Sequence, residues 1–321
     1  MVADELDLVP ANADFIVTVN VNLLRRVAVG RFLTAAGRQL PGLGRLDEVC
    51  GFDPTGSIDD LVLALPQGTL PSRPGLELMV AATGKFASPR LADCAERVVR
   101  QRGGTPARTP VGTFLTIRDR ARPEGGELAL RTGGPVLLAS GPSLRELIDV
   151  VEHRAPSARE EQLHGPLREA VGADGAIVAT WILRPGWLDH FVSPEEAARS
   201  TLTSLRGAAF RVAVAPDLEA RLLLACATSE GCHDVERTMQ ALLEDLDSAA
   251  HALLGLDLKR VEHHQGSRHV TFSLTIDQRE AEGLIERLTD DVLPALLGGV
   301  PVLGSAQPPR AGVPWSGSPS H

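Results

Sequence analysis

The chain has no tyrosine, and aromatic residues make up only 3% of its 321 positions. Proteins that bind single-stranded nucleic acid or sugars commonly stack their ligand on aromatic side chains, so this scarcity argues against both classes. The net charge of −9 also disfavours attraction to nucleic acid or to anionic lipid. We therefore expect no nucleic-acid partner. The expected partner is an unknown protein or a small ligand.

Long apolar runs are absent as well. No stretch reaches the about 18 apolar residues of a membrane-spanning helix, so no transmembrane segment is expected. The opening residues lack the basic and apolar regions of a secretory signal, so none is expected within this sequence. An apolar fraction of 43% and a charged fraction of 23% are typical of a globular protein, and the length allows two domains.

Catalytic signatures are missing too. The sequence has no G-x-S-x-G nucleophile motif, no phosphate-binding Walker loop, no dinucleotide-binding glycine pattern and no H-E-x-x-H metal motif. Each of these patterns places reacting or binding groups at a fixed spacing that the chemistry requires. We therefore expect no cofactor, and the sequence favours a protein without catalytic activity.

What the sequence does contain is an internal repeat. Residues 75–98 (GLELMVAATGKFASPRLADCAERV) resemble residues 217–240 (DLEARLLLACATSEGCHDVERTMQ). Leu76 corresponds to Leu218, which lies 142 positions further on. Each copy begins as an apolar strand, continues through a loop of small residues and ends as a helix with charged residues on its outer face. Similarity at a fixed offset predicts a duplicated architecture.

Hydrophobic periodicity and turn residues extend this repeat over most of the chain. In the first half they predict strands over residues 14–21, 58–65, 75–83, 111–117, 127–131 and 135–139, and helices over residues 23–39, 43–50, 89–102 and 143–153. In the second half they predict strands over residues 175–183, 205–215, 218–227, 256–264 and 268–276, and helices over residues 163–171, 185–200, 232–254 and 278–297.

This order of elements predicts an α+β fold, built as a duplicated unit of mainly antiparallel sheet with helices packed on one face. The first unit covers residues 1–153 and the second covers residues 161–297. Residues 298–321 are rich in glycine, proline and serine, so we expect a disordered tail there.

The four cysteines divide evenly between the halves. Cys50 and Cys94 belong to the first half, and Cys226 and Cys232 belong to the second. No pair has the C-x-x-C spacing of a zinc or redox motif. Two arrangements fit this distribution: one disulfide bond in each half, or four buried free thiols.

A thiol and an imidazole are adjacent where the long helix of the second half is expected to begin. Cys232 is followed by His233, and a helix N-terminus lowers the pKa of a thiol, so a nucleophile is conceivable. The first copy of the repeat has no counterpart, however. Asp234 is therefore expected to serve as the cap of this helix, where acidic side chains are favourable.

The candidate metal site is a hairpin rich in histidine. If Gly266 and Ser267 form a two-residue turn, His264 lies opposite His269, with Glu262 on the same surface. Two imidazoles and a carboxylate could form part of a metal site. The alternative is a hairpin tip that simply carries solvated polar residues.

Tryptophan occurs at three positions: Trp181, Trp187 and Trp315. Trp181 and Trp187 lie at the strand that opens the second half, where packing between the halves would explain both. Trp187 together with Phe191 could instead form a partner surface, because aromatic residues contribute strongly to protein interfaces.

Four short segments of the first half resemble a known group of bacterial proteins. They are residues 6–20 (LDLVPANADFIVTVN), 48–54 (EVCGFDP), 58–62 (IDDLV) and 91–94 (LADC). The group consists of extracytoplasmic, myxobacterial-type proteins that overlap the uncharacterised DUF3352-like proteins, often described as hypothetical proteins or lipoproteins. The resemblance implies a secreted or periplasmic setting and a bridge between Cys50 and Cys94. It implies no known activity.

Taken together, the duplication, the acidic surface and the missing catalytic patterns favour a non-catalytic extracytoplasmic protein that binds a ligand or serves as a scaffold. One alternative is a metal-dependent hydrolase that uses the His/Glu hairpin. Another is a cytoplasmic protein that binds a protein partner.

Overall fold

The computed structural model describes residues 4–27, 46–68, 77–122, 125–185, 187–190, 200–214 and 217–287. The strands of the first half are β1 (Ala13–Asn20), β2 (Ile58–Pro66), β3 (Met79–Gly84), β4 (Pro106–Val111), β5 (Phe114–Asp119), β6 (Gly126–Leu130) and β7 (Val136–Ser140). Those of the second half are β8 (Ile177–Ile182), β9 (Leu205–Ala213), β10 (Leu218–Cys226), β11 (Glu262–Gln265) and β12 (His269–Ile276).

The helices lie between these strands along the chain. The α-helices are α1 (Val21–Arg25), α3 (Leu46–Cys50), α4 (Ser88–Gln101), α5 (Gly141–Val151), α6 (His164–Val171), α8 (Ser229–Leu254) and α9 (Gln278–Arg287). Short 3-10 helices are η1 (Glu5–Leu8), η2 (Thr55–Ser57), η3 (Trp187–His190), η4 (Thr201–Ser204) and η5 (Leu258–Arg260). No helix within the described ranges is both long and apolar enough to cross a bilayer.

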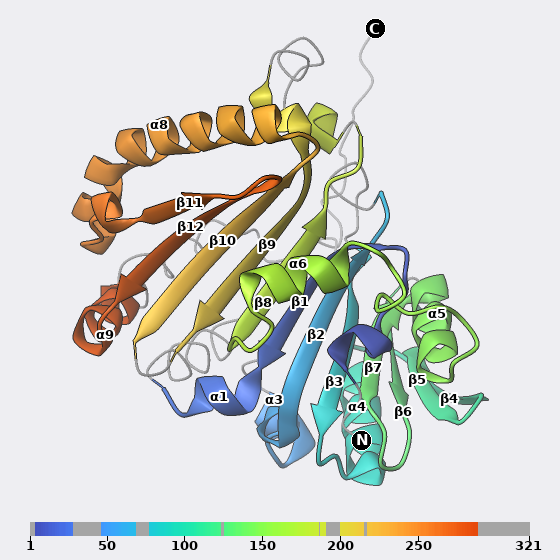
Figure 1. The fold of residues 1–321 in the computed structure, drawn as a ribbon. Coiled ribbons are helices and arrows are strands. Elements are labelled where there is room, and N and C mark those ends of the chain that lie inside the picture. Colours follow the sequence, from blue (N-terminus) through green and yellow to red (C-terminus); the bar gives the residue numbers. More distant parts are fainter. Residues whose placement is uncertain are drawn as a thin grey trace, which may run out of the picture.

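All of these strands form one antiparallel sheet in the order β11-β12-β10-β9-β8-β1-β2-β3-β7-β6-β5-β4 (Figure 1). The halves meet where β1 pairs with β8, and we call this pairing the seam. Outward from the seam, both halves follow the same order. The first half has β1, then β2 and β3, then its last strand β7, and the second half has β8, then β9 and β10, then its last strand β12. The predicted α+β fold with a duplicated antiparallel unit is therefore confirmed, and the two units share one sheet.

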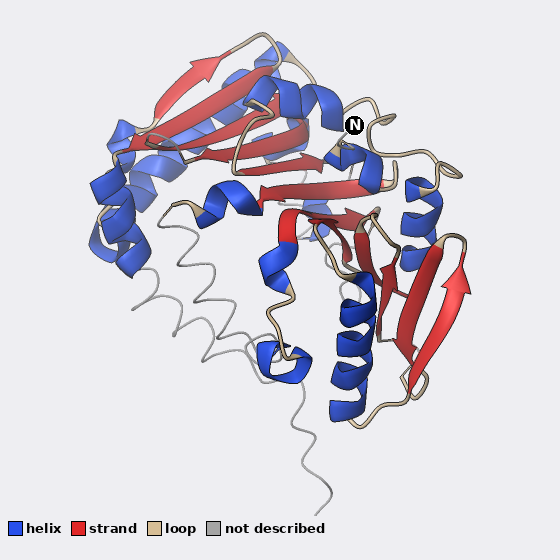
Figure 2. Cartoon of the chain, turned by 90° about the horizontal axis from the view of Figure 1, so that it is seen from below, coloured by secondary structure: helices blue, strands red, loops and turns tan. Residues whose placement is uncertain are grey.

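The helices cover both faces of this sheet, rather than one (Figure 2). In β6, Ala129 packs in the cluster of α5, whereas its neighbours Leu128 and Leu130 pack against α4. In β8, Val178 packs with α6, and Trp181 lies in the cluster of α8. Successive side chains of a strand point to opposite faces, so strands with consecutive apolar residues bury both faces.

One strand was not predicted. The strand expected over residues 111–117 is a hairpin of β4 and β5 with a turn at Gly112, whose φ of 58° favours glycine. Pro106 and Pro110 argue against a strand because proline cannot donate a backbone hydrogen bond to a neighbour. β4 tolerates both because it lies at the edge of the sheet.

Other expected elements are only partly described. The helix expected over residues 23–39 is represented by α1, and the one over residues 185–200 by η3, since residues 28–45, 186 and 191–199 lie outside the described residues. The strand expected over residues 256–264 begins later, because η5 precedes β11. The end of the helix expected over residues 278–297, and the expected tail at 298–321, also lie outside the described residues.

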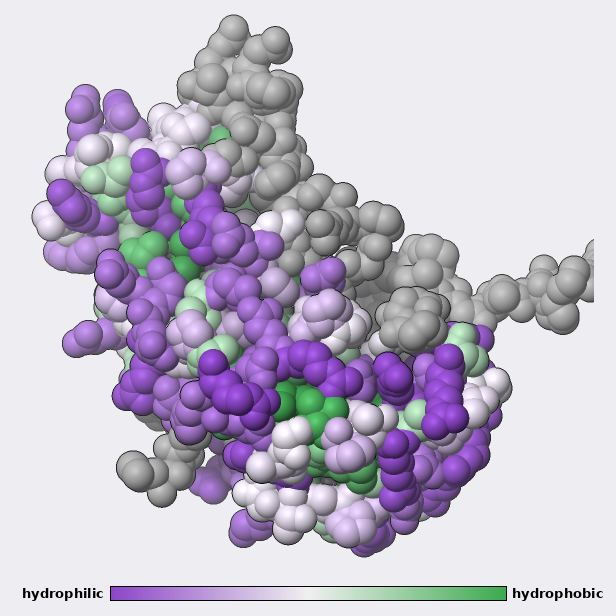
Figure 3. Space-filling view, turned by 90° about the vertical axis from the view of Figure 1, so that its right-hand side faces the viewer, coloured by the Kyte–Doolittle hydropathy of each residue, from purple (hydrophilic) through white to green (hydrophobic). Residues whose placement is uncertain are grey.

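The side of the molecule that carries α5 and the β4–β5 hairpin is mainly hydrophilic, with an apolar patch near the lower centre of the view (Figure 3). Arg108 of β4 pairs with Asp93 of α4 at 2.7 Å. Arg154, which follows α5, pairs with Asp149 at 2.5 Å. Exposed ion pairs of this kind contribute little to the stability of a fold, so the charged residues of this surface mainly keep it hydrated.

A buried histidine links the two halves on the face of the seam covered by α6. His164 of α6 is fully buried. Its Nε2 lies 3.0 Å from the backbone oxygen of Ala13, and its Nδ1 lies 2.8 Å from Oγ1 of Thr180. The neutral ring satisfies both contacts if Nε2–H donates to Ala13 and Nδ1 accepts from the hydroxyl. Burial lowers the pKa of His164, although the hydrogen bond to Ala13 opposes the shift.

We predict that the pH dependence of stability changes in the variant His164→Gln. Because the pKa of His164 is lower in the folded chain than in the unfolded chain, the unfolded chain binds a proton first as the pH falls below about 6.5. His164 therefore contributes stability above that pH and loses it below. We expect the variant to be less stable by about 1–2 kcal/mol at neutral pH. That deficit should shrink towards acidic pH.

Urea denaturation at pH 7.5 and pH 5.5 measures this difference. His251→Gln is the matched control, because His251 lies exposed on α8. A deficit of His164→Gln that stays constant between the two pH values would show that His164 does not titrate differently on folding.

Candidate functional site

A cavity of about 200 Å³ lies at one end of the seam. The first half contributes Asp14, Leu65, Pro66, Gln67 and Gly68, and the second half contributes Trp181, Ile182, Arg184, Pro185 and Trp187. Ligand sites occur preferentially between structural units, with apolar walls and a small number of polar groups. This cavity has both properties.

The register of the seam builds the apolar wall. Phe15 of β1 pairs with Leu65 of β2 on one side and with Trp181 of β8 on the other. Side chains at paired positions point to the same face, so these three lie side by side. Trp187 of η3 then packs on Trp181, with ring centroids 5.6 Å apart and planes at 68°, and Phe15 meets Trp181 at 6.3 Å and 83°. Edge-to-face contacts of this kind fix the orientation of the rings.

Asp14 enters the cavity because β1 is irregular at that point. Ala13 pairs with Pro66 and Phe15 pairs with Leu65, so Asp14 is the extra residue of a β-bulge. Bulges interrupt the pairing of a strand and redirect a side chain. Here the bulge places a carboxylate beside an otherwise apolar wall.

One ion pair joins the two halves at the cavity. The Nε–H of Arg184 donates to Oδ1 of Asp14 at 2.6 Å, and the backbone N–H of Gly68 donates to Oδ2 at 3.2 Å. The Asp14 side chain is 16% exposed and that of Arg184 is 40% exposed. The carboxylate therefore fixes the guanidinium group, which stays accessible to solvent.

No family model matches this sequence, and no curated protein matches it either. A solved structure of TP0453, in its crystal form I, is similar, with a TM-score of 0.51 at 9% sequence identity. The match covers 89% of this chain and 98% of that one. The likeness is one of fold. The resemblance to DUF3352-like proteins stays a prediction, since nothing in these comparisons bears on it.

The four cysteines form two disulfide bonds, one in each half. Cys50 bonds to Cys94 and so joins α3 to α4, with Cα atoms 4.7 Å apart. Cys226 bonds to Cys232 and joins the end of β10 to the first turn of α8, with Cα atoms 5.4 Å apart. None of the four cysteines is a free thiol, so the alternative of four buried thiols is wrong. Cys232 therefore has no thiol that could act as a nucleophile.

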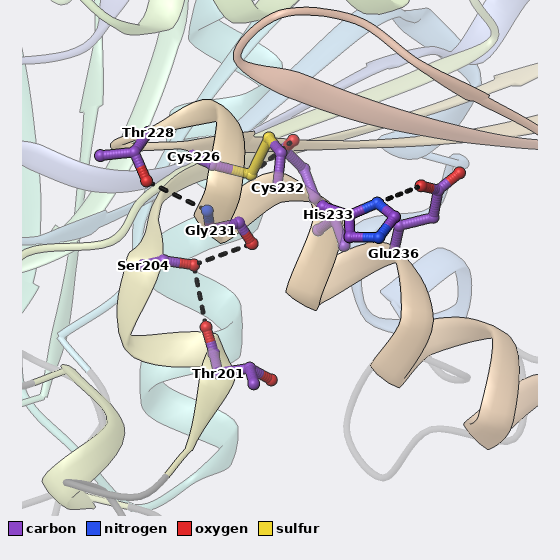
Figure 4. The surroundings of a disulfide bond; sticks show 9 residues. Thr201, Ser204, Cys226, Thr228, Gly231, Cys232, His233 and Glu236 are labelled. Atoms are coloured by element: carbon purple, nitrogen blue, oxygen red, sulfur yellow. Dashed lines mark hydrogen bonds and ion pairs between the residues drawn. A yellow bond between two sulfur atoms is a disulfide. The ribbon is translucent and has the colours of Figure 1, made fainter.

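The surroundings of the second disulfide correct the expected helix cap (Figure 4). Thr228 Oγ1 accepts a hydrogen bond from the backbone N–H of Gly231 at 3.0 Å, so Thr228 caps α8 and not Asp234. Asp234 lies one turn further and pairs with Arg237. The prediction was wrong because the helix begins three residues before Cys232, at Ser229.

The expected register of the histidine hairpin is also wrong. His264 pairs with Thr271, and the N–H of Gly266 donates to the carbonyl oxygen of His269 at 2.8 Å. The turn therefore has Ser267 and Arg268 at its tip, not Gly266 and Ser267, and His264 lies diagonal to His269 instead of opposite. Within the described residues, no group of three or more His, Cys, Asp or Glu side chains could hold a metal ion, and this includes Glu262, His264 and His269.

The cavity residues were only partly foreseen. Trp181 packs on Phe15 of the first half, which agrees with packing between the halves. Trp187 packs on Trp181 within the second half, and Phe191 lies outside the described residues. A partner surface formed by Trp187 and Phe191 stays a prediction. Asp14 and Arg184 were missed because they lie 170 positions apart, and only the antiparallel pairing of β1 with β8 brings them together.

Proposed function

We propose that this protein is a non-catalytic, extracytoplasmic binding protein that takes a small ligand in the cavity at the seam. The observation that carries the proposal is the cavity itself, whose walls come from both halves and contain two tryptophans and one ion pair. Apolar walls supply binding energy without direction, and a few fixed polar groups then select the ligand.

The two disulfide bonds support the extracytoplasmic setting. Disulfide bonds persist in oxidising compartments such as the periplasm and the cell exterior, and reducing systems remove them in the cytosol. All four cysteines are buried in the fold, as expected for bonds that stabilise structure. The resemblance to DUF3352-like proteins implies the same setting.

We predict that protein isolated from its native host without reductant contains both bonds. Alkylation under denaturing conditions should modify no cysteine before reduction and all four cysteines after it, as read by mass spectrometry. The double variant Cys226→Ser, Cys232→Ser is the control and should show the change for one bond only. Complete alkylation of the native-host protein without reduction would argue against the oxidising compartment.

Binding is tested with the tryptophans that line the cavity. In a Trp315→Phe background, fluorescence reports Trp181 and Trp187 only. We expect at least one compound from a set of single-ring probes of each charge to give a saturable change with a Kd of about 1 mM or tighter. The variant Trp187→Ala should weaken that binding by about tenfold, because it removes one aromatic wall.

The proposed function fails if none of the probes gives a saturable change. It also fails if Trp187→Ala leaves every Kd unchanged, because binding would then take place away from the seam.

A further inference from the structure

The two charged side chains of the cavity, Asp14 and Arg184, differ in how many of their hydrogen-bonding groups already have a partner in the protein. Both oxygens of Asp14 already accept hydrogen bonds, one from Arg184 and one from Gly68. A guanidinium group carries five N–H donors, and Arg184 uses its Nε–H for Asp14. Among the described residues, the terminal nitrogens of Arg184 have no hydrogen-bond acceptor.

The cavity therefore offers hydrogen-bond donors on Arg184, whereas the charge of its one carboxylate is already paired with that guanidinium group. A ligand that supplies acceptors complements such a site, and a planar carboxylate fits the two terminal nitrogens of a guanidinium group best. A cationic ligand would have to share the Asp14 carboxylate with Arg184, and it is repelled by the guanidinium group. The charge that the cavity selects is negative.

The size of the cavity limits the rest of the ligand. An engineered apolar cavity of about 150 Å³ holds one benzene molecule. The seam cavity is about 200 Å³, which leaves room for one ring and a short arm. Trp181, Trp187 and Leu65 form the apolar wall against which such a ring would pack.

We propose that the seam cavity binds a small carboxylate whose body is a single ring or an apolar group of similar size. The carboxylate contacts the terminal nitrogens of Arg184, and the apolar body lies against Trp181, Trp187 and Leu65. Asp14 acts as a positioning residue, because it fixes the guanidinium group through Nε. This inference rests on the proposed function, since it names the class of ligand for the same cavity.

Three probes with the same ring and different charge test the proposal: phenylacetate, benzyl alcohol and 2-phenylethylammonium. Titrations use the full chain in the Trp315→Phe background and follow tryptophan fluorescence. We expect phenylacetate to bind at least about tenfold more tightly than the other two, because it alone brings a negative charge that can form a bidentate ion pair with Arg184.

The variant Arg184→Gln should weaken phenylacetate binding by about tenfold and change the Kd of benzyl alcohol by less than about twofold. Unchanged benzyl alcohol binding also shows that the cavity is still formed in the variant. Arg118→Gln is the matched control, because Arg118 lies exposed on β5 away from the seam, and it should leave all three Kd values unchanged.

The outcomes separate this inference from the proposed function. If benzyl alcohol or the ammonium probe binds as tightly as phenylacetate, the seam cavity binds ligands and the carboxylate preference is overturned. The preference is also overturned if Arg184→Gln weakens phenylacetate and benzyl alcohol equally. If no probe binds, the proposed function itself is overturned.

Discussion

The pairing of β1 with β8 is the constraint on which the rest of the structure depends. It joins two similar units edge to edge, so that one sheet runs through the whole described chain. Because side chains alternate along β8, Thr180 faces α6 and forms a hydrogen bond with the buried His164, while Trp181 faces the other way and packs with Phe15. One strand pairing thus fixes a polar link on one face and an aromatic wall on the other.

The cavity follows from an irregularity in the same pairing. A regular β1 would turn the side chain that follows Ala13 away from the wall formed by Phe15, whereas the bulge at Asp14 places a carboxylate beside it. Arg184 leaves the end of β8 and meets that carboxylate across the seam. The duplication therefore produces a site that neither half contains alone, because the walls and the ion pair both draw on two units.

Parts of the fold can be read from the sequence and parts cannot. Alternating apolar residues and the repeat at residues 75–98 and 217–240 predict the strands, the long helix and the duplicated order. Local rules fail where tertiary position overrides them: Pro110 lies in a strand because β4 is at an edge. The predicted register of the β11–β12 hairpin was wrong. A shift of the turn by one residue moves every paired residue by two positions, and each side chain still points to the same face, so the apolar pattern does not reveal the shift.

The site was harder to predict because no local motif encodes it. Asp14 and Arg184 come from opposite halves, and their meeting depends on which strands form the seam, which periodicity does not reveal. The sequence does show that each half has two cysteines, but it does not show which elements they join. The bond between Cys50 and Cys94 joins two helices, and the bond between Cys226 and Cys232 joins a helix to the strand before it.

Hydrogen exchange followed by mass spectrometry tests most directly whether the seam is the binding site. Residues 13–20 and 177–182 belong to different halves and pair across the seam. The account predicts that saturating phenylacetate slows exchange in both segments together. Slower exchange in one half alone, or in neither segment while other regions change, would contradict it.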